Sequence, residues 1–143
     1  MGFFDSLFGG KKELPQLDPD SSAAKLIQEI QEPLNNICQQ TADNIELIPT
    51  ADAAYVFLGS PPKRFAITWI DKNGTIHNFK TLVEERGVPQ PKLERLVGKV
   101  GTAYRQSMNE TRFSSTQSGK TITVTPSDSL ADNLKQVIAE AVN

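Results

Sequence analysis

The most constraining feature of the sequence is the dipeptide Asn73-Gly74, which stands between two runs rich in β-branched and aromatic residues, RFAITWID and TIHNFKTL. Asn-Gly is the preferred pair of a type I′ turn, because both central residues of that turn take positive φ. The segment is therefore predicted to be a β-hairpin with a two-residue loop, in which Ile70 faces His77. One side of the hairpin is apolar and is expected to pack against helices. That side carries Phe65, Ile67, Trp69, Ile76 and Leu82.

Further strand and helix patterns flank this hairpin. Strand-like runs occur at IELI and AAYVFLG before it, and at TRFSS and KTITVT after it. Apolar residues spaced three and four apart predict helices that begin near Ser21, after Pro89 and after Pro126. Pro33 interrupts the first of these, which indicates one kinked helix or two short helices. The order α-β-β-β-α-β-β-α predicts an α+β fold with a mainly antiparallel sheet of about five strands and helices packed on one face.

The length of 143 residues fits one domain. Residues 9–20, GGKKELPQLDPD, mix glycine, proline and charge without periodicity, as linkers do. We therefore expect residues 1–20 to form a short apolar segment with a flexible linker, and residues 21–143 to form a single α+β domain. No apolar run approaches the roughly 20 residues of a membrane-spanning helix. The single cysteine, Cys38, can form no internal disulfide, so a cytoplasmic location is expected.

Charge is unevenly distributed, although the net charge is only −2. Residues 13–59 carry eight acids and one lysine, whereas residues 60–120 carry eleven bases and five acids. A basic region of this kind binds an anionic partner, or it pairs with the acidic part of its own chain. The polar face of the helix expected after Pro89 holds four cations, which we predict to contact a partner: Lys92, Arg95, Lys99 and Arg105.

Motifs that would indicate catalysis are weak. Residues 114–121, SSTQSGKT, differ from the phosphate-binding pattern G-x-x-x-x-G-K-[ST] only at the first glycine. A phosphate loop leads into a helix, whereas the following residues favour a strand, so we predict a hairpin turn here. The only histidine, His77, has no acidic partner specified by the pattern, and Cys38 lies on an apolar helix face as a structural thiol. We expect a non-catalytic protein with no cofactor and no metal site.

The opening segment, MGFFDSLFGGKK, holds four large apolar residues that we predict to bind a partner: Phe3, Phe4, Leu7 and Phe8. They would share one face of a short helix. Such a patch can touch lipid, dock in a groove of a partner or pack on its own domain, and we favour docking or self-packing. The segment resembles the MG-(L/F)-F-D-x-L-F-G openings of many unrelated bacterial cytoplasmic proteins. That resemblance favours a bacterial source and implies no family.

Together these patterns predict a small cytoplasmic accessory or adaptor protein that binds another protein, with self-association as an additional expectation. One alternative is a nucleic-acid-binding module that uses the basic region 60–120, because aromatic residues are interleaved with its cations. A second alternative is a peripheral membrane protein attached by its N-terminal segment. We expect direct membrane binding to be weak or absent, because the apolar segment is short and only Lys11 and Lys12 assist it.

Overall fold

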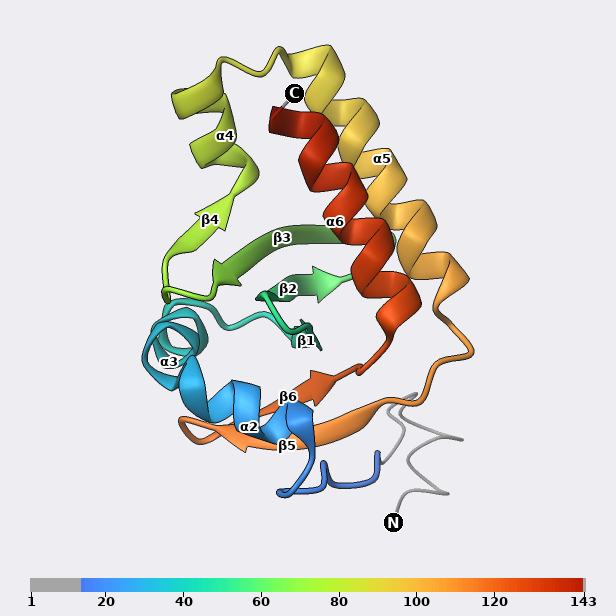
Figure 1. Ribbon diagram of the computed structural model, residues 1–143. Helices are drawn as coiled ribbons and strands as arrows, with labels where there is room; N and C mark the ends of the chain where they lie inside the picture. The colour runs from blue at the N-terminus through green and yellow to red at the C-terminus, as the bar shows by residue number, and fades with distance from the viewer. Residues whose placement is uncertain (1–13, 143) are drawn as a thin grey trace.

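The computed structural model describes residues 14–142 and shows one β-sheet between two groups of helices (Figure 1). In chain order the elements are α2 (Ser22–Glu29), α3 (Gln31–Gln40), β1 (Ile45–Pro49), β2 (Ala53–Ser60), β3 (Arg64–Asp71), β4 (Ile76–Asn78), α4 (Phe79–Arg86), α5 (Gln90–Gln106), β5 (Phe113–Gln117), β6 (Lys120–Val124) and α6 (Asp128–Val142). The sheet has six strands in the order β4-β3-β2-β1-β6-β5. All neighbours are antiparallel except β1 and β6, which run parallel. The predicted α+β class is confirmed, with a mixed sheet.

Helices cover both faces of the sheet, whereas the sequence analysis expected them on one face. Helices α4, α5 and α6 share one buried cluster with the sheet, and α2 and α3 share the other. Strand β2 divides its residues between the two clusters by simple alternation: Tyr55 and Phe57 belong to the first, and Ala54 and Val56 to the second. The continuous apolar run AAYVFL is the sequence signal of a strand that is buried on both faces.

The hairpin at Asn73-Gly74 is present, but its register differs by one residue from the predicted one. Trp69 pairs with His77, so Ile70 faces Ile76 rather than His77, and the loop has three residues. Within this loop only Gly74 takes a positive φ, at 83°, and its amide donates to the Asp71 carbonyl at 2.9 Å. The shift moves Ile76 away from the predicted buried side, and it is 37% exposed.

The second strand of this hairpin is short because a helix begins inside the predicted strand. Strand β4 ends at Asn78, which is the N-cap of α4. The Asn78 side chain accepts from the Thr81 amide at 2.9 Å, and the Thr81 hydroxyl accepts from the Asn78 amide at 3.1 Å. This reciprocal capping box satisfies amides that would otherwise lack partners. Leu82 still reaches the core, from a helix instead of a strand.

The first helical segment consists of two helices, one of the two predicted forms, and the chain bends at Ile30. Pro33 lies in the first turn of α3, where its missing N–H costs no helical hydrogen bond. Cys38 is buried on the apolar face of α3, as predicted, and this burial raises the pKa of its thiol. The segment 114–121 forms the predicted hairpin turn, with positive φ at Ser118 and Gly119.

Residues 14–17 lie against the outer edge of β5. The Ser114 amide donates to the Pro15 carbonyl at 2.8 Å, and the Leu17 amide donates to the Ser114 carbonyl at 2.9 Å. Gln16 forms a parallel bridge with Ser114. The last part of the predicted linker is therefore hydrogen-bonded to the sheet.

Candidate functional site

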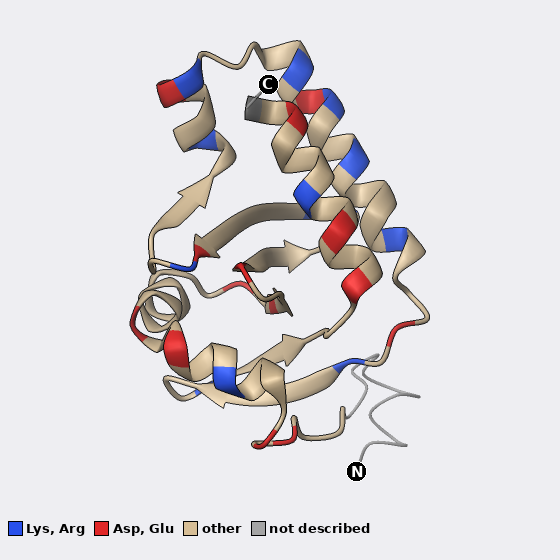
Figure 2. Cartoon of the chain, viewed as in Figure 1, with Lys and Arg blue, Asp and Glu red and all other residues tan. Residues whose placement is uncertain are grey.

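Helix α5 presents the four predicted cations. Its apolar residues Leu96, Val100 and Tyr104 are buried against the sheet and α6, which turns the opposite face outward. Arg95, Lys99 and Arg105 are exposed, and Lys92 is half-buried. Figure 2 shows lysine and arginine along the outer side of α5, next to α6.

The four cations do not form one cluster. At about 3.6 residues per turn, Lys92, Arg95 and Lys99 lie on the side of α5 that faces α6. The Lys99 ammonium there pairs with Glu140 of α6 at 2.8 Å. Arg105 lies toward the opposite border of the outer face, on the same side as Gly101. A Cβ atom at position 101 would lie 3.8 Å from Pro62. Within residues 14–142, the guanidinium groups of Arg95 and Arg105 have no ion-pair partner.

Gly98 occupies the centre of this outer face. It is exposed, and a Cβ built on it meets no atom within 4 Å. Glycine inside a helix costs about 1 kcal/mol relative to alanine. The described fold therefore gives no packing reason for a glycine at this position, whereas Gly101 contacts the turn between β2 and β3.

Four of the five aromatic residues of the basic region pack in the core, and the fifth, Phe113 on β5, is half-buried. Trp69, Phe79 and Tyr104 are buried, and Phe65 packs against the same cluster. Trp69 stacks on His77 with 5.9 Å between ring centroids. These rings are occupied by packing, so they offer no stacking platform for nucleic-acid bases.

A buried carboxylate, Glu46 on β1, holds three segments together on the α5 side of the sheet. Its Oε1 accepts from the Tyr104 hydroxyl at 2.6 Å, and its Oε2 accepts from Thr125 at 2.6 Å and from Arg112 Nε at 3.0 Å. Arg112 also lies 5.2 Å from the centre of the Tyr104 ring. Burial, followed by the hydrogen bond to Glu46, raises the pKa of Tyr104 to about 12.

Every polar group at the centre of this network is satisfied, which identifies it as a structural element. Glu46 is only 9% exposed, so a ligand has little access to it. The Arg112 guanidinium also donates to the Ser107 carbonyl and hydroxyl, which ties the end of α5 to the start of β5. Sequence reasoning missed this network because Tyr104, Arg112 and Thr125 lie 58, 66 and 79 residues from Glu46.

His77 does have an acidic partner, which the sequence pattern did not specify. Its Nε2 lies 2.8 Å from Asp71 Oδ2, and both side chains are about one-third exposed. The hydrogen bond from His77 lowers the pKa of Asp71. Asp71 Oδ1 also accepts from the amides of Asn73 and Thr75, so the pair closes the hairpin loop. No hydroxyl or thiol side chain of residues 14–142 is hydrogen-bonded to the His77 ring.

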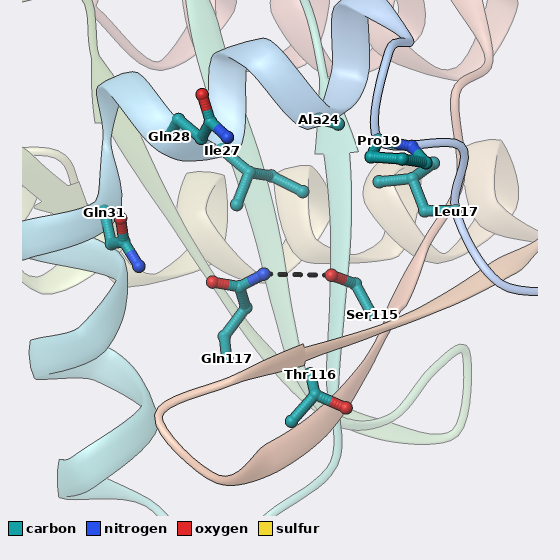
Figure 3. Close-up of a pocket in the computed structure, with 9 residues that line it drawn as sticks. All are labelled: Leu17, Pro19, Ala24, Ile27, Gln28, Gln31, Ser115, Thr116 and Gln117. Atoms are coloured by element: carbon teal, nitrogen blue, oxygen red, sulfur yellow. Dashed lines mark hydrogen bonds between the residues drawn. The ribbon is translucent and has the colours of Figure 1, made fainter.

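A groove of about 300 Å³ lies between α2 and the edge strand β5 (Figure 3). Its lining contains no charged residue and consists of Leu17, Pro19, Ala24, Ile27, Gln28, Gln31, Ser115, Thr116 and Gln117. Within it, Gln117 Nε2 donates to the Ser115 hydroxyl at 2.9 Å. This groove could not be predicted from the sequence, because its residues come from three separate segments.

A second, wider hollow of about 590 Å³ lies on the other side of α2, next to the ends of β1 and β6. Its lining mixes both signs of charge, with Lys25, Glu29 and Asp128 among apolar and small residues. These groups are not arranged around one chemistry, so the hollow defines no ligand class.

The remaining predicted site residues, Phe3, Phe4, Leu7 and Phe8, lie outside the described residues. Among residues 14–142, no helix combines the length and apolar character needed to cross a membrane. The same range holds no group of three or more His, Cys, Asp or Glu side chains that is arranged to hold a metal ion. No family model, no curated protein and no solved structure matches the chain.

Proposed function

We propose that this protein is a non-catalytic adaptor that binds an acidic helix of another protein on the outer face of α5. The observation that carries this proposal is Gly98, an exposed helical glycine between two arginines that lack ion-pair partners within the described chain. A missing side chain lets a second backbone approach closely, which offsets the helix-propensity cost that Gly98 imposes on the isolated protein.

The positions of the arginines define the chemistry of the partner. Arg95 and Arg105 lie on opposite sides of Gly98 in the chain and about 15 Å apart along the helix axis. A helix that crosses α5 at Gly98 would place carboxylates near both guanidinium groups. Lys99 is already paired with Glu140, so it contributes less to the charge that a partner meets.

A protein partner fits these residues better than nucleic acid or lipid. Bases would need exposed aromatic rings, and four of the five rings of the basic region pack in the core. The chain as a whole is acidic, with a sequence pI near 5.4, which opposes the long-range attraction of any polyanion. A short acidic helix meets only the local charge of α5. The N-terminal residues Phe3, Phe4, Leu7 and Phe8 remain the predicted second contact, which an adaptor requires.

Affinity capture with the full chain from its native source tests this proposal. We expect the double variant Arg95→Glu/Arg105→Glu to reduce the recovered partner at least tenfold. Gly98→Leu should reduce it similarly while raising the melting midpoint, because leucine is the better helix former. Lys25→Glu/Lys72→Glu, at exposed positions away from α5, is the charge-matched control and should leave capture unchanged.

Two outcomes would contradict the proposal. One is partner capture that is unaffected by both α5 variants. The other is submicromolar binding of a single-stranded oligonucleotide at physiological salt that is lost in the arginine double variant. We expect oligonucleotide binding no tighter than roughly 100 µM, which is the range of non-specific contacts.

A further inference from the structure

The outer edge of β5 is only partly paired. Backbone groups in an antiparallel strand point alternately toward and away from the neighbouring strand. The amide and carbonyl of Ser114 point away from β6, because the amide donates to the Pro15 carbonyl and the carbonyl accepts from the Leu17 amide. Thr116, two residues further on, therefore directs its amide and carbonyl to the same side. Within residues 14–142, neither group has a backbone partner on that side.

Pairing along this edge stops where the groove of Figure 3 begins. After Leu17 the chain turns away from β5, with the Ser21 amide donating to the Asp18 carbonyl at 3.1 Å, and enters α2. The groove then runs between α2 and Thr116, and Figure 3 shows Gln28 and Gln31 on one side of it and residues 115–117 on the other. An open strand edge and an adjacent groove are the two parts of a strand-addition site.

We propose that an extended, uncharged segment of a partner protein binds here as an additional strand on β5. Its backbone would pair with the amide and carbonyl of Thr116. This pairing would extend, further along the edge of β5, the one that residues 15–17 make with Ser114. Its side chains would lie against Ile27 and the glutamine amides of the groove. The lining residues carry no charge that would compensate a buried ion, so charged side chains facing α2 are excluded.

This site is independent of the surface proposed on α5, because it lies on α2 and β5. At the opposite edge of the sheet, β4 has only three residues before α4 begins. The β5 edge combines the open backbone groups of Thr116 with an adjacent groove, and the groove would supply most of the contact with an extended segment.

The test uses the full-length protein as bait for random peptides displayed on phage. Enriched peptides are then synthesised, and their affinities are measured by fluorescence anisotropy. We expect enriched peptides to be uncharged at alternate positions and to bind Thr116→Pro at least tenfold more weakly. Proline removes the outward amide without removing a bond to β6. Thr116→Val keeps the amide and should bind as the wild type does.

A second variant leaves the strand backbone intact. Gln28→Trp on the exposed surface of α2 would fill the groove and should also weaken binding at least tenfold. Asn36→Trp on α3, outside the groove, is its control and should have no effect. The proposal is overturned if no peptide is enriched, or if enriched peptides bind Thr116→Pro and Gln28→Trp as tightly as the wild type. Concentration-dependent dimerisation that Thr116→Pro abolishes would overturn it as well, because a second copy would then be the occupant.

Discussion

The two faces of the sheet are built by different means. The face under α4, α5 and α6 contains the large aromatic side chains, including Phe57, Trp69 and Tyr104, together with the buried carboxylate network of Glu46. The face under α2 and α3 is aliphatic, with Leu34, Leu47 and other branched side chains and no aromatic residue in its buried cluster. The buried cluster of one layer therefore contains directional hydrogen bonds and ring contacts, and that of the other is aliphatic.

This difference bears on where the protein can bind other molecules. On the α5 side, the Tyr104 hydroxyl bonds to Glu46 of β1, and Arg112 joins Glu46 to the Ser107 carbonyl at the end of α5. On the other side, α2 and α3 cover β1, β2 and β6 but leave a groove beside β5. Aliphatic packing tolerates small shifts at lower cost than a hydrogen-bond network does. We therefore expect the groove to adjust to a peptide more readily than the outer face of α5.

The largest expected effect is on the network. Glu46→Ala removes the acceptor of three donors and leaves the Arg112 cation without its partner. We expect the free energy of unfolding, from urea denaturation, to fall by about 4 kcal/mol, as for a broken buried ion pair. Glu29→Ala, at an exposed position of α2, should change it by less than about 0.5 kcal/mol. A loss below about 1 kcal/mol for Glu46→Ala would show that the network adds little and would remove the contrast between the faces.

The matching change on the aliphatic face is Leu34→Ala. Leu34 is fully buried, and truncation leaves a cavity, so we expect a loss of about 3 kcal/mol in the same denaturation experiment. The two sites lie on opposite sides of the sheet, so the double variant should lose close to the sum of the single losses. A coupling above about 1 kcal/mol would mean that the layers are not independent.

Alkaline pH tests the network without a mutation. The pKa of Tyr104 is raised in the folded protein to about 12, from its usual value of 10.0. The neutral hydroxyl is thus favoured by folding, and its stabilisation is complete below pH 10 and is lost as the pH rises toward 12. The loss should reach about 2 to 3 kcal/mol. Urea denaturation across this range should show a steeper decline for the wild type than for Tyr104→Phe.

Tyrosinate absorbance gives a second measurement of the same effect. The chain has two tyrosines, and the pKa of Tyr55 is also raised, mainly by burial. We therefore expect little tyrosinate in the folded protein near pH 10 and a marked increase on unfolding at that pH. Ordinary tyrosine titration in the folded state would contradict the burial of the Tyr104 hydroxyl.

A smaller effect is expected at the hairpin. Gly74→Val should lower the free energy of unfolding by about 1 kcal/mol or more, because a β-branched residue resists the positive φ of Gly74. Asn73→Ala should cost less than about 0.5 kcal/mol, because Asn73 does not take a positive φ in the three-residue loop. Equal losses in thermal melts of the two variants would instead favour the two-residue type I′ turn.

The sequence predicted those parts of the fold that depend on local spacing. Apolar periodicity correctly predicted the helices α2, α3, α5 and α6. Ser118-Gly119 lies at the turn of a hairpin, as predicted for residues 114–121, and not in a phosphate loop. The errors came from competing local signals. Asn-Gly occurs in both two-residue and three-residue loops, so it did not fix the register of the hairpin. The capping pair Asn78 and Thr81 begins α4, and so ends the strand earlier than its β-branched composition predicted.

The layers and the candidate surfaces could not be predicted in this way. Whether helices cover one face or both depends on contacts between segments far apart in the chain. The partners of Glu46 are more than fifty residues away, and the groove combines residues near 17, 27 and 116. Spacing did identify the cations of α5, because they repeat along one helix, but it did not show that Lys99 is paired while Arg95 and Arg105 are not.

The smallest expected effect concerns the N-terminus. If Phe3, Phe4, Leu7 and Phe8 belonged to the core, their loss would cost several kcal/mol, at about 1.5 to 2 kcal/mol for each buried side chain. We instead expect a variant lacking residues 1–12 to keep the melting midpoint of the full chain, because it retains the hydrogen bonds of Pro15 and Leu17 to Ser114. A variant lacking residues 1–17 loses those bonds and should melt at a lower temperature.

The same pair of variants separates anchoring from docking. The full chain should stay in the supernatant when it is mixed with neutral or mildly anionic vesicles, because even a single myristoyl chain binds membranes only marginally. Vesicle pelleting that disappears on removal of residues 1–12 would identify a membrane anchor. A large fall in melting midpoint for that shorter deletion would place the segment in the core. We expect neither outcome. Instead, the variant lacking residues 1–12 should show weaker partner capture or weaker self-association in sedimentation, because these measurements report docking of the apolar residues on a protein surface.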